Sequence, residues 1–463
     1  MTTSPRPESP PEAAVQVLPI VRGAAAARAS LLQRLPLEET PIPPMMAGAL
    51  RRMLGREERD RDLRPEEAVR RILTAVRGEG DAALRRFTEA IEGSAPAEWL
   101  VSDAEMRAAR DAVDPETLQA LQLAAEQVRR FHERQMAHAV RSFMEDGQGQ
   151  RVRPLRRVGL YVPGVAVVYP STVLHTAIPA LVAGVEDVCI ASPADATGAV
   201  SPLKLVAAEI AGVRTVYKVG GAQAIAALAY GTESIPAVDK IFGPGNIFVT
   251  LAKRQVFGDV GIDALYGPTE TLIVADHSAD PELCSADLLA QAEHDELACP
   301  ILITPSEQLA EAVARIVPER ARTMERGAIA LAAFHNRGGI VLAEDVETAL
   351  TLADEFAPEH MALQVEAAER RAERIANAGG LFIGEASPEA LADYAAGPSH
   401  VMPTGGSARY ASPLTVNDFL KITTLVHLSE STLQEIGPVA ERIAEAEGLG
   451  GHARSLAIRR RDR

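Results

Sequence analysis

VGLYV at residues 158–162 decides the fold, because it is the first of several short apolar runs that alternate with helical stretches. The following runs are DVCIAS (187–192), RTVYKV (214–219) and DKIF (239–242). Stretches of helical character separate or follow them, beginning near Ser171, near residue 200, at AQAIAALAY and at NIFVTLAKRQV. Strands that alternate with helices in this way require right-handed crossovers and a parallel sheet.

A second series with the same alternation begins near residue 270. Its runs are TLIVAD (271–276), PILITP (300–305), GGIVLA (338–343) and GGLFIG (379–384). The two series predict an α/β protein with two Rossmann-like parallel-sheet domains. A chain of 463 residues agrees with this prediction, since single cores stop growing at about 250–300 residues.

The two ends of the chain differ from this central part. Residues 1 to about 13 are polar and Pro-rich, which is typical of disorder. Residues 14–150 have mostly helical spacing, with Pro65 suited to a helix start and Gly93 to a helix end. From about residue 410 the chain holds one amphipathic helix, the segment GLGGH and a basic end. We expect this last part to form a helical arm, because it is too short to bury a core alone.

Charge and composition exclude several classes of partner. The formal net charge of −16 repels nucleic acid and anionic lipid, so neither is expected to bind. No apolar run reaches membrane-spanning length, and the N-terminal MTTSPRPESPPE lacks a signal-peptide core, so we expect a cytoplasmic protein. Cys189, Cys284 and Cys299 form no CxxC pair and are expected to be small buried side chains.

Two Gly-rich turns lie between a predicted strand and a predicted helix, VGGAQ (219–223) and FGPGN (242–246). Glycine lets the backbone approach a ligand, and the N-terminus of the following helix offers free N–H groups to a phosphate. Neither turn has the GxGxxG or GxxxxGK[ST] pattern. Taken singly, each is better explained as an ordinary tight turn.

The predicted helix 281–298 can be capped by Asp280, and Pro281 fits its first turn. Gln291 and His294 are three residues apart and would share one helix face, where an amide oxygen and an imidazole can bind a divalent cation. A solvated helix face is the alternative. Asp287 would lie on the same face, either supporting those ligands or as a solvated charge.

Three further segments carry candidate groups. FAPEHM (356–361) places Glu359 beside His360, in an expected turn at a sheet edge, where the two could act as acid and base. A polar loop explains this segment equally well. Asp393 and His400 lie in a Gly- and Pro-rich segment, and Glu447 and His452 lie near the C-terminus. Local reasoning alone treats the last two as surface residues of a frayed end.

Taken together and in this order, these segments resemble histidinol dehydrogenases. LPIVR (18–22) also fits that family. The blocks that carry the resemblance are GLYVPG (159–164), GGAQAIAALAYG (220–231), KIFGPGN (240–246), GPTE (267–270), ADLLAQAEHD (286–295), APEH (357–360), DYAAGPSHVMPT (393–404) and AEGLGGHA (446–453).

The resemblance implies a reaction and a role for each candidate. It implies two successive NAD-dependent oxidations of L-histidinol, through L-histidinal to L-histidine, with one zinc ion per subunit and a homodimer whose active sites are shared. The implied catalytic pair is Glu359 and His360. The implied zinc ligands are Gln291, His294, Asp393 and His452. The implied NAD contacts are Tyr161, Gln223 and Asn246. The implied substrate contacts are Thr269, His360, His400 and Glu447, together with the zinc ligands.

The resemblance also implies a division of the chain. We expect an N-terminal tail or arm (1–40), a first Rossmann-like domain with the Glu-His pair and metal residues (41–138 and 269–409), a second on the NAD side (139–268), and a C-terminal arm (410–463).

The sequence departs from the family pattern at Val165, Tyr266, Thr269 and Ser399. These departures keep open a paralogous zinc- and NAD-dependent dehydrogenase acting on another small alcohol, such as sulfopropanediol. A non-catalytic binding or regulatory protein on the same scaffold is a second alternative, and a structural zinc protein is the least favoured because no cysteine cluster exists.

Overall fold

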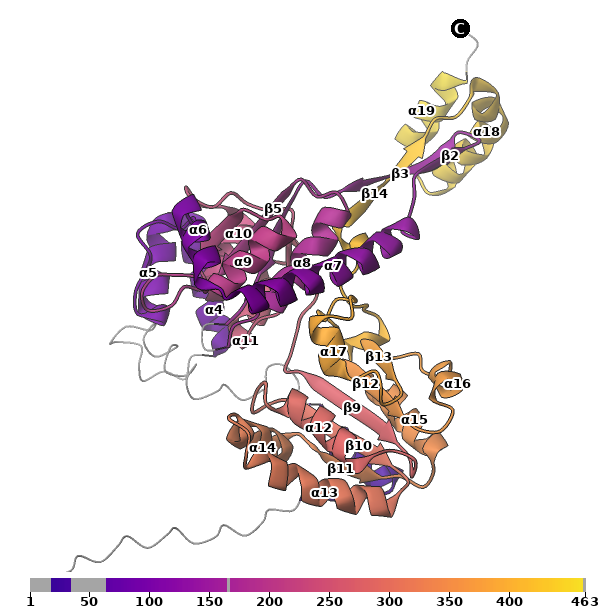
Figure 1. The fold of residues 1–463 in the computed structure, drawn as a ribbon. Helices are drawn as coiled ribbons and strands as arrows, with labels where there is room; N and C mark the ends of the chain where they lie inside the picture. Colours follow the sequence, from indigo (N-terminus) through magenta and orange to yellow (C-terminus); the bar gives the residue numbers. More distant parts are fainter. Residues whose placement is uncertain (1–17, 35–63, 165–166, 461–463) are drawn as a thin grey trace, which may run out of the picture.

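The computed structural model describes residues 18–34, 64–164 and 167–460. It contains two parallel-sheet domains and a C-terminal helical arm, so the predicted fold class is confirmed (Figure 1). The N-terminal residues expected to be disordered lie outside the described part. None of the helices in the described ranges has the length and apolarity needed to cross a bilayer.

The first domain is built on a five-stranded parallel sheet with the order β6-β5-β4-β7-β8. Its strands are β4 (Arg157–Tyr161), β5 (Asp187–Ser192), β6 (Thr215–Lys218), β7 (Lys240–Phe242) and β8 (Gly261–Ile262). The connecting helices are α8 (Pro170–Val182), α9 (Pro202–Ala211), α10 (Gly221–Tyr230) and α11 (Ile247–Val256). The strand order changes direction between β4 and β7, which is where ligands bind in sheets of this kind.

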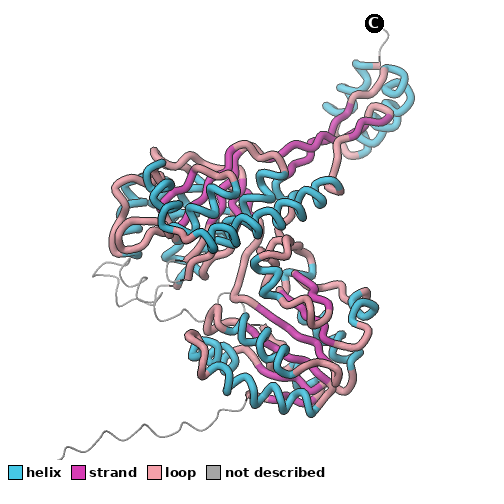
Figure 2. Tube along the Cα trace, viewed as in Figure 1, coloured by secondary structure: helices cyan, strands magenta, loops and turns pink. Residues whose placement is uncertain are grey.

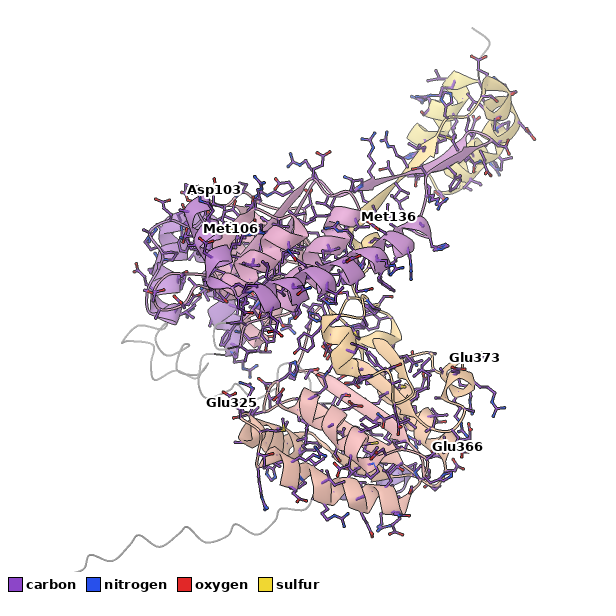
Figure 3. The ribbon with its side chains drawn as sticks, viewed as in Figure 1. Asp103, Met106, Met136, Glu325, Glu366 and Glu373 are labelled. Atoms are coloured by element: carbon purple, nitrogen blue, oxygen red, sulfur yellow. The ribbon has the colours of Figure 1, made fainter. Side chains whose placement is uncertain are left out.

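The helical N-terminal part covers both faces of this sheet. Its helices are α4 (Pro65–Glu79), α5 (Asp81–Glu92), α6 (Asp103–Ala112) and α7 (Pro115–Ala137). Pro65 begins α4, and Gly93 ends α5 in the left-handed conformation, as predicted. Helices α4 and α5 pack on α10, whereas α6 and α7 pack on α8 and α9. Figure 3 shows this layer, with Met106 in α6 and Met136 near the end of α7.

This packing corrects the expected domain division. Residues 41–138 were grouped with residues 269–409, but the described part of that segment shares its core with residues 158–266. The reason is that an amphipathic helix shows in its sequence that it has an apolar face, but not which sheet that face covers.

The second domain is built on a six-stranded parallel sheet, in the order β1-β11-β10-β9-β12-β13. Its strands are β1 (Ile20–Arg22), β9 (Glu270–Ala275), β10 (Cys299–Thr304), β11 (Gly339–Leu342), β12 (His360–Gln364) and β13 (Gly380–Ile383). Edge strand β1 comes from the segment expected to be an N-terminal tail, and it pairs with β11. It therefore belongs to this domain.

Helices cover both faces of the six-stranded sheet. On one face lie α12 (Pro281–Ala292), α13 (Glu307–Ala321), α14 (Gly327–Asn336) and α17 (Glu389–Tyr394). On the other lie α1 (Ala24–Arg28), α15 (Val346–Phe356) and α16 (Ala368–Ala372). Asp280 caps α12 and Pro281 occupies its first turn, as predicted. The helix ends at Ala292 rather than residue 298, because Asp295 forms a turn that accepts from the N–H groups of Leu297 and Ala298.

The C-terminal arm projects from the first domain, and the two strands that lead to it lie side by side (Figures 1 and 2). Strand β14 (Leu420–Val426) pairs antiparallel with β3 (Gln148–Pro154), and β3 pairs with β2 (Phe143–Glu145). Two helices that pack on one another, α18 (Glu430–Ala446) and α19 (Gly450–Arg459), form the end of the arm. The sequence did not predict this three-stranded sheet. Short one-turn helices at Ser407–Arg409 and Val416–Phe419 precede β14.

Candidate active site

Glu359 and His360 lie at the N-terminal edge of the six-stranded sheet. The turn after α15 uses Ala357 in the left-handed conformation, and β12 then begins at His360. The expected turn at a sheet edge is therefore present. Glu359 is 8% exposed and His360 3% exposed, so both groups are largely removed from water. Their nearest charged atoms, Glu359 Oε2 and His360 Nδ1, are 3.6 Å apart.

Hydrogen bonds from Thr269 and from the first residue of the neighbouring strand β9 hold the Glu359 carboxylate. Its Oε2 lies 2.8 Å from the hydroxyl of Thr269 and accepts from the backbone N–H of Glu270 at 3.1 Å. Burial raises the pKa of Glu359 to about 7, although His360 and these hydrogen bonds act in the opposite direction. A carboxyl group with such a pKa can exchange a proton near neutral pH, which suits a general acid or base.

The imidazole of His360 is fixed from one side. Its Nδ1 is 3.1 Å from the carbonyl oxygen of Glu270, and Nε2 has no hydrogen-bond partner among the described residues. Burial lowers the pKa of His360, but the carboxylates of Glu359, Asp393 and Glu389 raise it more, to about 10. Because Nδ1 faces a carbonyl acceptor, Nε2 is the atom that can take a proton from a ligand.

Three of the four expected metal ligands lie near this pair. Gln291 Nε2 is 3.3 Å from Asp393 Oδ2, and Asp393 Oδ1 is 3.7 Å from His360 Nε2. His294 follows the end of α12, and its Nδ1 contacts the carbonyl of Ala290 at 3.1 Å, which leaves Nε2 free to bind a metal. Two oxygen donors and one imidazole are donor types that zinc accepts. Gln291, His294 and Asp393 therefore suit the implied zinc ion, but they are only three of its four expected ligands.

The fourth expected ligand, His452, lies on α19 in the arm, as does the expected substrate contact Glu447 at the end of α18. Both side chains are exposed. Figure 1 shows these helices at the far end of the arm, away from the six-stranded domain. Within the described ranges of one chain, no cluster of three His, Cys, Asp or Glu residues could hold a metal ion. One chain alone therefore does not bring all the expected ligands together.

His400 connects the two domains. Its Nδ1 is 2.8 Å from the carbonyl oxygen of Asp393, and its Nε2 is 3.1 Å from the hydroxyl of Thr172 on α8. Its ring also stacks on the buried His175, with centroids 4.4 Å apart. Burial lowers the pKa of both imidazoles. The departure Ser399 takes part in the same contact, because its hydroxyl donates to the carbonyl of His175 at 3.1 Å.

The expected NAD residues lie at the C-terminal edge of the five-stranded sheet. Tyr161 ends β4, and its hydroxyl accepts from the N–H of Gly221 in the first Gly-rich turn at 3.1 Å. Gly243 in the second turn packs so closely that a Cβ atom there would lie 2.1 Å from the Tyr161 carbonyl oxygen. Each Gly-rich turn alone is weak evidence of a binding site. In the structure both turns lie beside Tyr161, at the point where the strand order changes direction.

Two further side chains complete this edge. Gln223 is fully buried, with Nε2 3.3 Å from Glu92 and Oε1 without a partner in the described structure. Asn246 caps α11 through its side-chain oxygen. A dinucleotide fits such an edge, because glycine turns and helix N-termini accept phosphate groups and Gln223 offers an unpaired polar atom.

Several polar groups around the site were not predicted from the sequence. Glu389 is buried at the start of α17, bonds with Thr271, and has a pKa that burial raises to about 7. His175 and Thr172 were also missed, because a helix periodicity does not tell a buried polar residue from an exposed one. The sequence feature that could have indicated His175 and Thr172 is the presence of polar residues in the otherwise apolar helix PSTVLHTAIPALV.

The remaining residues singled out in the sequence are Asp287 and two of the departures from the family pattern, Tyr266 and Val165. Asp287 accepts from Gln364 Nε2 at 2.9 Å, so its carboxylate is neither fully solvated nor bonded to Gln291 or His294. Tyr266 is buried and donates to Asp263 at 2.9 Å. Val165 lies outside the described residues.

The fold and the site define a two-domain α/β enzyme, with an acid–base pair at one sheet edge and Gly-rich turns at another. The family model for histidinol dehydrogenase matches residues 55–460, and the chain belongs to this family. It is 48% identical over 443 residues to a histidinol dehydrogenase of Deinococcus radiodurans, covering 94% of this chain and 98% of the relative.

Two more relatives agree with this assignment. A histidinol dehydrogenase of a Synechococcus strain is 47% identical over 414 residues, covering 89% of this chain and 95% of the relative. The crystal structure of a histidinol dehydrogenase from Elizabethkingia anophelis matches with a TM-score of 0.84 and 31% identity, covering 96% of this chain and 98% of that one.

Proposed function

We propose that this chain is an NAD-dependent enzyme that oxidises L-histidinol to L-histidine through L-histidinal, and that it works in the cytoplasm. The observation that carries the proposal is the buried Glu359–His360 pair, placed beside Gln291 and Asp393 in a chain of the histidinol dehydrogenase family. The pair consists of one carboxylate and one imidazole, which differ in basicity and lie in a site with little water. Such a pair suits a reaction that has two separate proton transfers.

His360 is the proposed base for the alcohol. The Glu270 carbonyl at 3.1 Å holds Nδ1, so Nε2 faces the substrate and takes the hydroxyl proton while the carbon-bound hydrogen leaves as hydride. Tyr161, Gln223 and Asn246 would hold NAD at the edge of the first sheet, and NAD bound there would supply the hydride acceptor. After that proton has passed to water, the same imidazole can take a second proton when the hydrated aldehyde is oxidised.

Glu359 is the proposed base for water. Both of its hydrogen bonds end on Oε2, so Oε1 is the oxygen that can take a proton from a water molecule attacking the aldehyde. A pKa of about 7 keeps a large fraction of this carboxyl ionised at neutral pH and still makes it a useful base. Thr269 fixes the carboxylate and also lies 3.2 Å from Gln291.

Gln291, His294 and Asp393, with His452, are the residues that would hold zinc. The ion would supply a Lewis acid that orients the amine and imidazole of the substrate and lowers the pKa of nearby groups, His360 included. Thr269, His400 and Glu447 are the remaining proposed substrate contacts. The proposed NAD contacts are Tyr161, Gln223 and Asn246.

We propose further that the enzyme is a homodimer, in which the arm of each subunit contributes Glu447 and His452 to the site of its partner. The arm supports this, because it exposes many large apolar side chains, as a surface that covers another protein does. These side chains are Phe143, Met144, Ile422, Val426, Ile436, Val439, Ile443, Leu449 and Ile458.

The reaction is tested by measuring NADH formation with purified protein and L-histidinol. We expect two NADH for each L-histidinol consumed, with L-histidine as the product. Sulfopropanediol is the matched control substrate. One NADH per substrate, or oxidation of sulfopropanediol in preference to L-histidinol, would overturn the proposal.

The shared site is tested by mixing two variants, Glu359→Gln and His452→Ala, which we expect to be nearly inactive alone. After unfolding and refolding together in equal amounts, half of the dimers pair one variant with the other. Each mixed dimer then has one site with both changes and one with neither, so about a quarter of all sites regain activity. Variants that refold and exchange subunits but recover no activity would show that His452 serves its own chain.

A further inference from the structure

A buried lysine lies at the NAD edge of the first domain and has no role in the chemistry described above. Lys204 is the third residue of α9 and is 3% exposed. Its Nζ donates to the carbonyl of Pro163 at 2.8 Å, to the carbonyl of Gly164, and to the hydroxyl of Ser192 at 2.9 Å. All three N–H donors of the ammonium group therefore have an acceptor.

The position of this charge is unfavourable in three ways. Buried ammonium groups lose hydration, and burial lowers the pKa of Lys204 to about 8. A cation in the first turn of a helix also opposes the helix dipole. In addition, no carboxylate of the described residues forms an ion pair with Lys204. The three hydrogen bonds are the interactions that offset these costs.

The acceptors of Lys204 belong to two neighbouring strands. Pro163 and Gly164 form the turn directly after β4, and Ser192 is the last residue of β5. The turn is tightly built, because Gly164 has a φ of +94° and a Cβ atom there would lie 2.0 Å from the carbonyl oxygen of Val167. Lys204 ties this turn to the end of β5.

The turn begins two residues after Tyr161, which contacts both Gly-rich turns. The second Gly-rich turn is held in a similar way, since Lys253 donates to the carbonyl of Gly243 at 3.0 Å. Lys253 also forms an ion pair with Asp263, whereas Lys204 bonds only to neutral oxygens. Two buried lysines thus hold backbone carbonyls at the same sheet edge.

We propose that Lys204 is a positioning residue for NAD: its ammonium group fixes the Pro163–Gly164 turn against β5 and so shapes the edge on which the dinucleotide binds. This inference rests on the proposed NAD-dependent function. It predicts that loss of Lys204 weakens cofactor binding and leaves the binding of the alcohol substrate unchanged, because the Glu359–His360 site lies at an edge of the other sheet.

The test uses full-length Lys204→Met, which keeps the length and volume of the side chain but removes its charge and donors. The Kd for NAD, measured by calorimetry without substrate, should rise about tenfold, the equivalent of one hydrogen bond to a charged group. The KM for NAD should rise in parallel, while the KM for L-histidinol stays within twofold. Lys204→Gln, which keeps N–H donors, should show a smaller rise in the Kd for NAD. This variant is measured instead if the Met variant does not fold.

Lys218→Met is the matched control. Lys218 is the third buried lysine of this domain and ends β6, and its Nζ bonds to Glu105 at 2.9 Å. Its loss should lower thermal stability without changing the Kd for NAD. Folded Lys204 variants with the NAD affinity of the wild type would overturn the inference and leave the proposed function intact. A wild-type chain that does not bind NAD would overturn both.

Discussion

Glu359→Gln should separate the two oxidations. Glutamine keeps the volume of the side chain and can still accept the hydrogen bonds from Thr269 and the Glu270 N–H through its amide oxygen. It cannot take a proton from water. Because a positioned general base contributes about 10²–10⁴-fold, the oxidation of L-histidinal should slow by that factor. The reverse reduction of L-histidinal to L-histidinol needs no attacking water and should slow less than about tenfold.

The assay follows NADH by absorbance in both directions, with L-histidinal and NAD or with L-histidinal and NADH. In the wild type, L-histidinal oxidation should rise with pH through about 7, because the carboxylate is the active form and burial raises the pKa of Glu359 to that value. The rise should disappear in the glutamine variant. His360→Asn is the comparison, since it should slow both oxidations. Equal losses for oxidation and reduction in Glu359→Gln would refute the assignment of water activation to Glu359.

Three further changes test the surroundings of the site. Alanine at His294 or Asp393 should remove most of the zinc, measured by atomic absorption, and nearly all turnover; full activity with stoichiometric zinc would contradict the proposed ligands. Asp287→Asn should leave zinc affinity within about threefold and lower the melting temperature, because its partner is Gln364; a larger loss of zinc would give Asp287 a role at the metal. Arg34→Met should cost about 3–5 kcal/mol in the free energy of unfolding, measured by denaturant titration, since it leaves the buried Glu270 carboxylate without its ion-pair partner.

The sequence predicted eight of the eleven strands described in the two parallel sheets, because their signals are local, and missed β1, β8 and β12. A run such as DVCIAS is apolar throughout and is bounded by turn residues, which is typical of a strand covered on both faces. The structure gives it as β5 over the same residues, Asp187–Ser192. The strands of the antiparallel sheet were missed because they are largely exposed, as in LKITTLV, and lack such a signal.

Long-range contacts were harder to predict. Helices α4 and α7 have clear helical spacing, yet nothing in that spacing shows that they pack on α10 and α8. Buried charged groups were the second difficulty. Lys204 and Glu389 look like surface charges in the sequence, and only their three-dimensional neighbours show that their polar atoms are bonded inside the protein.

The proposed site residues come from the family resemblance, because the local alternatives for His452 and Glu447 were at least as good. The structure shows why local reasoning could not succeed for these two: both are exposed on an arm, as the residues of a frayed end would be. Their proposed role depends on a second chain, which no spacing within one sequence can reveal.

The strand order β6-β5-β4-β7-β8 of the first domain is repeated as β11-β10-β9-β12-β13 in the second, but the two sheets present different edges to the proposed site. In the first domain, Tyr161 and the Gly-rich turns lie at the C-terminal ends of the strands, whereas in the second, Glu270 and His360 begin their strands. Hydride transfer requires these edges to meet. His400 supplies such a contact, because it bonds the backbone of Asp393 on one side and Thr172 on the other. Thr172 lies in the first turn of α8, which follows β4 and its Pro163–Gly164 turn. The contacts of His400 therefore fix the proposed metal ligand Asp393 relative to the proposed cofactor edge.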